Sequence, residues 1–186
     1  MVADIQPASK LSTGKVALLT ILASETVFFV TLLVAYAALR GQLHWPVQHT
    51  LTRLALPLAN TLVLVVSVLP ASFATTRLRQ DKASTSQALQ AMTLALGLIF
   101  VAGQIYEFGH AGMRVDDQAL GGVFFTLVGF HALHVLAGMA FIIINLVRTR
   151  LGDFSAGNYE SVELGTWFWY YVTAVWIVLF SALYLV

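Results

Sequence analysis

The sequence of 186 residues contains no cysteine, which excludes disulfide bonds, thiolate metal sites and iron–sulfur clusters. Charge is also scarce: Asp, Glu, Lys and Arg make up 10% of the chain, whereas a soluble domain carries about 25%. The formal net charge of +1 gives no indication of a nucleic-acid partner, so none is expected. Four prolines and no biased repeat argue against a disordered chain or a solenoid.

Hydrophobic residues make up 59% of the chain and gather into five long runs. A helix that crosses a bilayer needs roughly 20 mainly apolar residues. Five runs are long enough, at about residues 16–39, 54–73, 88–106, 120–147 and 162–186. We therefore predict an all-α, polytopic membrane protein: a polar N-terminal segment (1–15), with no signal peptide, and a single domain (16–186) of five transmembrane helices. The short connections predict that consecutive helices pack antiparallel.

The positive charges predict the orientation of these helices. If the N-terminus lies inside, the inside segments hold seven Lys and Arg residues and the outside segments hold three. Cytoplasmic loops are enriched in Lys and Arg, so the N-terminus is expected inside and the C-terminus outside. The inside residues are Lys10, Lys15, Arg77, Arg79, Lys82, Arg148 and Arg150, and the outside residues are Arg40, Arg53 and Arg114.

Glu25 lies about ten residues into the first run, where an ionised carboxylate costs roughly 2.5–3.5 kcal/mol. It is expected to be protonated, paired, or exposed to a wet or protein-lined cleft. One interpretation is a neutral acid that hydrogen-bonds across helices. The other is a role in a proton path or in contact with a lipid headgroup.

The second run carries Pro57, Asn60 and Pro70. Pro57 costs little in an opening turn, whereas Pro70 should bend or end the helix. Asn60 can hydrogen-bond to a neighbouring helix.

In the third run, Gln104 and Glu107 fall on one helical face, which indicates a helix–helix interface. Glu107 and His110 form one E-x-x-H element. Di-iron bundle proteins use two such elements and two further carboxylates, and no second element is present, so the metal interpretation is weak.

His131 and His134 stand three positions apart in the fourth run. A b-type haem would need a second histidine at matching depth on another helix, and a catalytic zinc would need three protein ligands. The remaining histidines, His44, His49 and His110, lie in or beside loops. We therefore predict that His131 and His134 form hydrogen bonds between helices. No metal ligands and no catalytic residues are assigned.

The fifth run contains Trp167, Trp169 and Trp176, which are typical of an aromatic packing surface or an interfacial belt. Glu163 stands near its start, where the helix dipole favours a carboxylate.

Taken together, these residues resemble subunit III of the haem–copper oxidases, the family of cytochrome c and quinol oxidases. The resemblance extends from about residue 16 to 186 and corresponds to the short, five-helix bacterial type. Ser24-Glu25 with Phe28-Phe29 is similar to the family's S-E-x-x-F-F, and Pro57, Asn60 and Thr61 are similar to its P-L-x-N-T. Gln104 and Glu107 are similar to Q-x-x-E, and Gly129-Phe130-His131 with His134-Val135 is similar to G-F-H-x-x-H-V. Glu163, Trp167, Trp169 and Trp176 are similar to E-x-x-x-W-x-W and a later tryptophan.

The chain departs from the family pattern near its last helix. Asn158 and Tyr159 replace a common histidine pair, Tyr170 replaces a histidine and Thr173 replaces an aspartate. These changes weaken the expectation that the inner loop collects protons or binds a cation. They indicate a divergent bacterial branch.

The resemblance implies a non-catalytic subunit of a terminal oxidase in the bacterial inner (plasma) membrane. Such a subunit carries no cofactor of its own, since haem and copper belong to its partners. It packs mainly against subunit I, and also near subunits II and IV, binds phospholipid and supports proton uptake in aerobic electron transport. Cytochrome c is the expected electron donor. The alternatives are a quinol oxidase subunit, a nitric oxide reductase-associated homologue or a b-type haem anchor. A transporter is disfavoured because five spans do not divide into two repeats.

Overall fold

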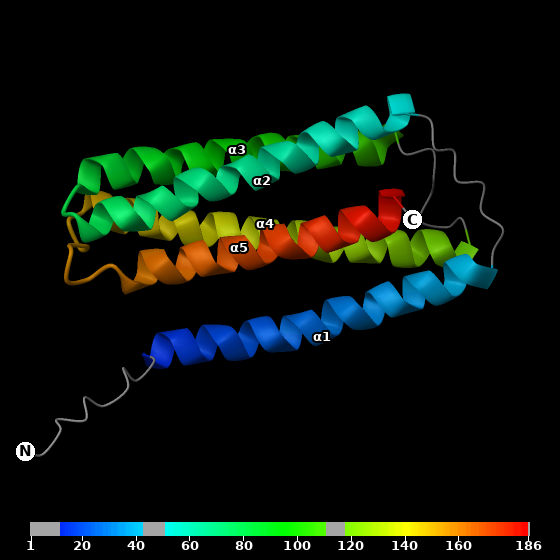
Figure 1. Ribbon diagram of the computed structural model, residues 1–186, viewed down its shortest axis with the longest axis horizontal. Coiled ribbons are helices and arrows are strands. Elements are labelled where there is room, and N and C mark those ends of the chain that lie inside the picture. The colour runs from blue at the N-terminus through cyan, green and yellow to red at the C-terminus, as the bar shows by residue number, and fades with distance from the viewer. Residues whose placement is uncertain (1–11, 43–50, 111–117, 186) are drawn as a thin grey trace, which may run out of the picture.

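A computed structural model describes residues 12–42, 51–110 and 118–185, and these residues form five long helices (Figure 1). The helices are α1 (Thr13–Gln42), α2 (Leu51–Arg79), α3 (Ala83–His110), α4 (Gln118–Arg150) and α5 (Glu160–Phe180), and a π-helical turn (Ser181–Leu185) extends α5.

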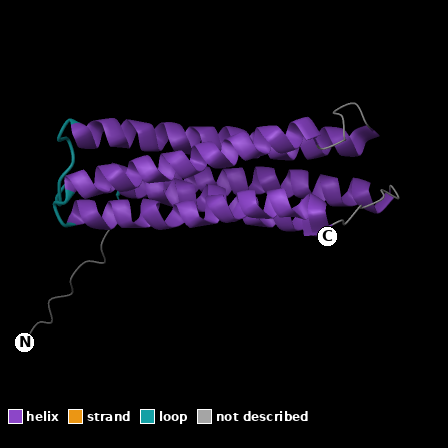
Figure 2. Ribbon diagram, turned by 90° about the horizontal axis from the view of Figure 1, so that it is seen from above, coloured by secondary structure: helices purple, strands orange, loops and turns teal. Residues whose placement is uncertain are grey.

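All five helices are long and apolar enough to cross a membrane, and they lie along one common direction (Figure 2). The prediction of an all-helical, polytopic membrane protein with five spans is therefore confirmed. Each helix also continues into the polar sequence beside its apolar run. Hydropathy marks only the part of a helix that contacts lipid, so the apolar run is shorter than the helix, which ends where its backbone turns.

Of the two outcomes predicted for Pro70, an end of the helix does not occur, because α2 continues to Arg79. Proline removes one backbone hydrogen bond. Ending the helix within the membrane would expose many more unpaired backbone groups, which cost several kcal/mol each in lipid. Continuation of the helix through Pro70 therefore costs less free energy than an end of the helix within the membrane.

The bundle has two ends, which we name by the chain segments found there. The proximal end holds the start of α1, the α2–α3 turn and the α4–α5 connection, and the distal end holds the opposite helix termini (Figure 1). In the α2–α3 turn, Asp81 has a φ of 56°, which this residue type tolerates. Its carboxylate accepts a hydrogen bond from the Ala156 amide at 2.8 Å, which ties the turn to the α4–α5 connection.

The helices do not all pack against their neighbours in sequence. Helices α2 and α3, α3 and α4, and α4 and α5 pack in chain order, as expected, and α2 also packs on α5. The main neighbours of α1, however, are α4 and α5. Within its apolar stretch 11% of α1 is buried, against 39% in α2 and in α4. Helix α1 is therefore the peripheral member of the bundle.

Candidate functional site

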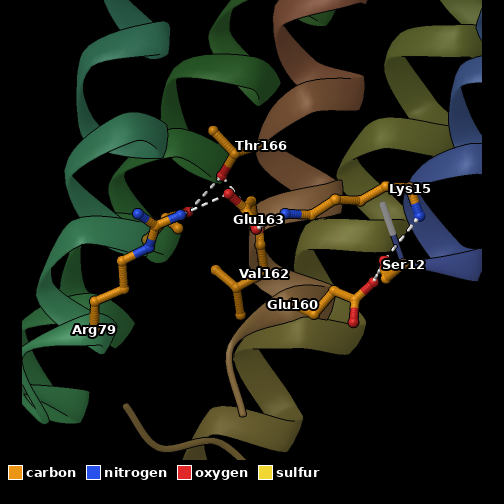
Figure 3. A network of polar contacts seen from close by, with 8 residues as sticks. Ser12, Lys15, Arg79, Glu160, Val162, Glu163 and Thr166 are labelled. Carbon is orange, nitrogen blue, oxygen red and sulfur yellow. Dashed lines mark hydrogen bonds and ion pairs between the residues drawn. The ribbon is translucent and has the colours of Figure 1, made fainter. Parts of the chain in front are cut away.

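Glu163 joins three helices at the proximal end through two ion pairs (Figure 3). Its two carboxylate oxygens lie 2.9 Å from Lys15 Nζ of α1 and 2.6 Å from Arg79 Nη2 of α2. The Glu163 side chain is 11% exposed, while that of Arg79 is 47% exposed. One carboxylate on α5 thereby fixes the ends of α1 and α2. We call these three residues the Glu163 cluster.

Local helix chemistry favours the Glu163 cluster. Glu163 lies in the first turn of α5 and Arg79 is the last residue of α2, and both positions suit the helix dipole. Each cation also lies over an aromatic ring, with Lys15 Nζ 5.3 Å from the centre of Trp167 and Arg79 Cζ 4.6 Å from that of Tyr159. These contacts hold the long cationic side chains in one place.

Next to the cluster, Ser12 donates a hydrogen bond to the Glu160 carboxylate, which adds a second link between the start of α1 and α5 (Figure 3).

A second polar pair lies deep within the spans, where Glu25 of α1 meets His134 of α4 at 3.0 Å between Oε2 and Nε2. The other ring nitrogen, Nδ1, lies 2.7 Å from the Phe130 carbonyl. Since a carbonyl can only accept, Nδ1 carries a proton. Nε2 then accepts a hydrogen bond from neutral Glu25, or an imidazolium donates a hydrogen bond to ionised Glu25. In either arrangement the pair has no net charge, as its place in the membrane requires.

Aromatic rings surround this pair. The ring of Phe29 lies 5.1 Å from that of His134, and Phe28 and Phe130 pack edge to face at 4.8 Å. The S-E-x-x-F-F and F-H-x-x-H elements thus meet across α1 and α4. The Glu25 side chain is one-third exposed, so one side of the pair remains open.

His131 differs from the expectation of a hydrogen bond between helices. Its ring is buried and stacks on Trp176, with 4.8 Å between ring centres, while Phe100 meets it edge-on at 6.2 Å. Within the described part of the chain, neither ring nitrogen has a hydrogen-bond partner. His131 therefore acts as a packed aromatic ring, whereas His134 forms the polar link.

Trp169 and Trp176 occupy the centre of the bundle and are fully buried. Trp169 Nε1 donates to Ser67 Oγ at 2.9 Å, and Trp176 Nε1 donates to Thr61 Oγ1 at 3.0 Å. Both bonds join α5 to α2, so these rings form a packing surface and not an interfacial belt. Trp167 is only partly buried and lies near the proximal end beside Lys15.

Asn60 links α2 to α3, because its Nδ2 donates to the Phe100 carbonyl at 3.1 Å. Gly103 makes room for it, since a Cβ there would lie 2.7 Å from Asn60 Cγ. Gln104 and Glu107, by contrast, form a hydrogen bond within α3, at 2.9 Å.

The described ranges 12–42, 51–110 and 118–185 bring together no three His, Cys, Asp or Glu side chains that could hold a metal. His44, His49 and the side chain of His110 lie outside the described residues.

The chain is similar over almost its whole length to proteins of one known family. The sequence model for cytochrome c oxidase subunit III matches residues 9–186. The chain belongs to the cytochrome c oxidase subunit III family. It is 32% identical over 170 residues to cytochrome c oxidase subunit 3 of Thermostichus vulcanus, which covers 90% of this chain and 85% of that protein. A probable cytochrome c oxidase subunit 3 of Nocardia farcinica is also 32% identical over 170 residues, covering 89% of this chain and 84% of the relative.

The platypus (Ornithorhynchus anatinus) subunit 3 is 37% identical over 136 residues, which cover 72% of this chain but 51% of that longer protein. This chain is thus a multi-pass membrane protein of the subunit III family whose length is closer to that of the bacterial relatives.

The sequence indicates both members of the Glu25–His134 pair, but it does not indicate the partners of Glu163 and Trp169 in this subunit III chain. Lys15 and Arg79 were counted only for orientation, and Ser67 was not singled out. Lys15 and Arg79 could have been predicted as partners of Glu163 from their positions, since all three residues stand at the same end of the bundle. No comparable signal marks Ser67, because hydroxyl residues are common in all the spans.

Proposed function

We propose that this chain is the accessory, non-catalytic subunit III of a haem–copper terminal oxidase that takes electrons from cytochrome c. It holds subunit I in its active form, packs mainly on subunit I and near subunits II and IV, binds phospholipid and supports proton uptake. A quinol oxidase is the second candidate, because both enzyme types share this family.

The observation that carries the proposal is the way the chain uses the polar side chains in its spans. Glu25 pairs with His134, and Glu163 pairs with Lys15 and Arg79. Two buried tryptophans of α5 bond to hydroxyl groups of α2. These groups link helices to one another and leave a peripheral α1 whose surface is largely open to lipid or to a partner. A scaffold needs such links, whereas a redox centre needs convergent ligands.

Purification of the native complex in mild detergent tests the proposal. We expect the chain to co-purify with a haem-containing subunit, and a partner with two copper-binding cysteines to mark a cytochrome c enzyme. Removing this chain should leave the haem spectrum unchanged while shortening the active lifetime of the enzyme. Haem absorbance from the isolated chain would contradict the proposal.

The proposed orientation places the proximal end on the cytoplasmic side of the bacterial inner membrane. The described cations Lys15, Arg77, Arg79, Lys82, Arg148 and Arg150 at that end support it. Because the chain has no cysteine, single cysteines report location without background. Ser155→Cys at the proximal end should be protected from an impermeant thiol reagent in intact cells, and Gly41→Cys at the distal end should be labelled. The reverse pattern would overturn the orientation.

Phospholipid binding is supported by the surface of the proximal end. The Arg79 side chain is about half exposed there, at the end of an apolar helix where lipid headgroups lie. Mass spectrometry of the purified complex should detect bound lipid, and Arg79→Gln should reduce its amount. Unchanged lipid content in this variant would exclude the site.

A further inference from the structure

A small cavity lies between the helices in the proximal half of the bundle. Its volume is about 10 Å³, and every residue that lines it is buried. Four lining side chains are polar: Gln90 and Thr93 of α3, Asn145 of α4 and Thr166 of α5. Empty cavities in proteins are apolar, whereas polar cavities of this size hold water, and one molecule needs roughly 10–15 Å³.

The side-chain amide of Gln90 is incompletely paired. Gln90 is 3% exposed, and its Nε2 donates to Ser86 Oγ and Thr149 Oγ1, each at 3.2 Å. Within the described residues its Oε1 has no hydrogen-bond partner. Exchanging the two ends of the amide does not help. Oε1 could then accept from Ser86 Oγ, but Thr149 Oγ1 already donates to the Asn145 carbonyl, and the NH₂ group would have no acceptor. A buried group of this kind requires a partner.

The other polar walls offer matching groups. Thr93 Oγ1 donates to the Leu89 carbonyl at 3.0 Å, so its oxygen can still accept. Asn145 Nδ2 donates one of its two protons to the Ser161 carbonyl at 3.0 Å, so the second remains for another acceptor. A water molecule both donates and accepts and can satisfy these groups together.

We propose that this cavity binds one ordered water molecule, which joins α3 to α4 through Gln90, Thr93 and Asn145. A metal cation fits less well, because no carboxylate lines the cavity. The inference rests only on side chains of this chain and does not depend on which oxidase the chain serves.

High-resolution cryo-electron microscopy of the purified complex tests the site directly. An isolated density peak is expected in the cavity, at hydrogen-bonding distance from the Gln90 amide and from Asn145 or Thr93. A cavity without density, in a map that shows other ordered waters at equal depth, overturns the proposal.

Two variants on the same helix sharpen this test. Gln90→Met keeps the length of the side chain but removes its polar atoms, and we expect loss of the peak. Gln87→Met is the matched control: Gln87 lies one turn earlier and donates to the Thr149 carbonyl at 3.2 Å, but it does not line the cavity. The density peak in the cavity should remain in the Gln87→Met variant. A peak that persists in Gln90→Met, or disappears in both variants, contradicts the assignment.

A chemical readout on the wild-type complex does not depend on variant assembly. X-ray radiolysis of a bound water produces hydroxyl radicals that oxidise adjacent side chains, which peptide mass spectrometry locates. Val162 lines the cavity and is 3% exposed, whereas Val172 is 1% exposed and lies elsewhere in α5. Greater oxidation of Val162 than of Val172 supports the proposal, and equal oxidation overturns it.

Discussion

Helices α1 and α5 differ in how hydrophobicity relates to burial. In a soluble protein the more hydrophobic helix is usually the more buried one, whereas here it is the less buried one. The apolar stretch of α1 is the more hydrophobic of the two, yet 11% of it is buried, against 33% of α5. Val27 and Val34 of α1 are 67% and 62% exposed, while Trp169 and Trp176 of α5 are fully buried. Lipid is as apolar as a protein core, so hydrophobicity places both helices in the membrane without deciding which is central.

What distinguishes the two helices is the kind of contact that each makes. Helix α5 packs large rings against glycines, with Trp169 between Gly97 of α3 and Gly138 of α4. Helix α1 relies more on polar links at separate depths, namely those of Lys15 to Glu163 and of Glu25 to His134. Changes in α5 should therefore destabilise the whole bundle, whereas changes in the links of α1 should loosen α1 alone.

The largest effect is expected from Trp169→Ala. The substitution removes a fully buried ring and its bond to Ser67, and truncations of this kind cost about 3–5 kcal/mol. We expect the free energy of unfolding in mild detergent to fall by that amount and the subunit to be lost from the complex. Phe73→Ala, at a position 53% exposed on α2, is the control and should have little effect. Equal losses in the two variants would show that the Trp169 ring is not central to the packing of the bundle.

Gly138→Ala tests the close packing of the same ring. A Cβ at this position would lie 3.0 Å from Trp169 Cε3 and 3.3 Å from Phe168 Cδ1. Overpacking of this kind costs about 1–3 kcal/mol, which thermal unfolding can measure. Gly129→Ala on the same helix is the matched control, because its Cβ would meet nothing within 4 Å. Destabilisation by Gly129→Ala as large as that by Gly138→Ala would refute a specific fit of the ring.

The sequence predicted the five helices because each carries an apolar run of membrane length. It also singled out Glu25, His134 and Glu163, since a polar group within or beside a hydrophobic run requires a partner. The identity of those partners could not be predicted, because pairing depends on how the helices pack around one another. Chain order suggested α2 as the neighbour of α1, but the groups that Glu25 and Lys15 meet are on α4 and α5.

His131 shows the same limit in another form. Its position three residues from His134 suggested a shared polar role, but residues three apart on a helix can face different neighbours. His134 faces α1 and Glu25, while His131 faces the rings of Phe100 and Trp176. Hydropathy and spacing cannot distinguish a histidine that packs as an aromatic ring from one that forms a hydrogen bond.

The Glu163 cluster should contribute less than the packing of Trp169. Glu163→Gln leaves Lys15 and Arg79 without a counter-ion, but both cations are partly exposed, so we expect a loss of about 1 kcal/mol. Limited proteolysis should then cut near the start of α1 before it cuts the other helices. Asp153→Asn is the control. Both side chains of the Asp153–Arg148 pair are exposed, so the pair should contribute almost nothing to stability. Uniform proteolysis of all helices in Glu163→Gln would argue against a local clamp on α1.

The smallest effect on stability is expected from Glu25→Gln, which tests where the proton of the Glu25–His134 pair lies. Separating two charges in lipid is costly, so we expect neutral Glu25 to donate to Nε2 of His134. A glutamine amide donates to the same nitrogen, so stability should change by less than about 0.5 kcal/mol. Infrared spectroscopy of the wild type should show the C=O stretch of a protonated carboxylic acid that is absent from Glu25→Gln, with Glu107→Gln as the control for the other membrane carboxylate. If no such band is lost and stability falls by more than 1 kcal/mol, the pair is an ion pair, and charge as well as hydrogen bonding holds α1 in place.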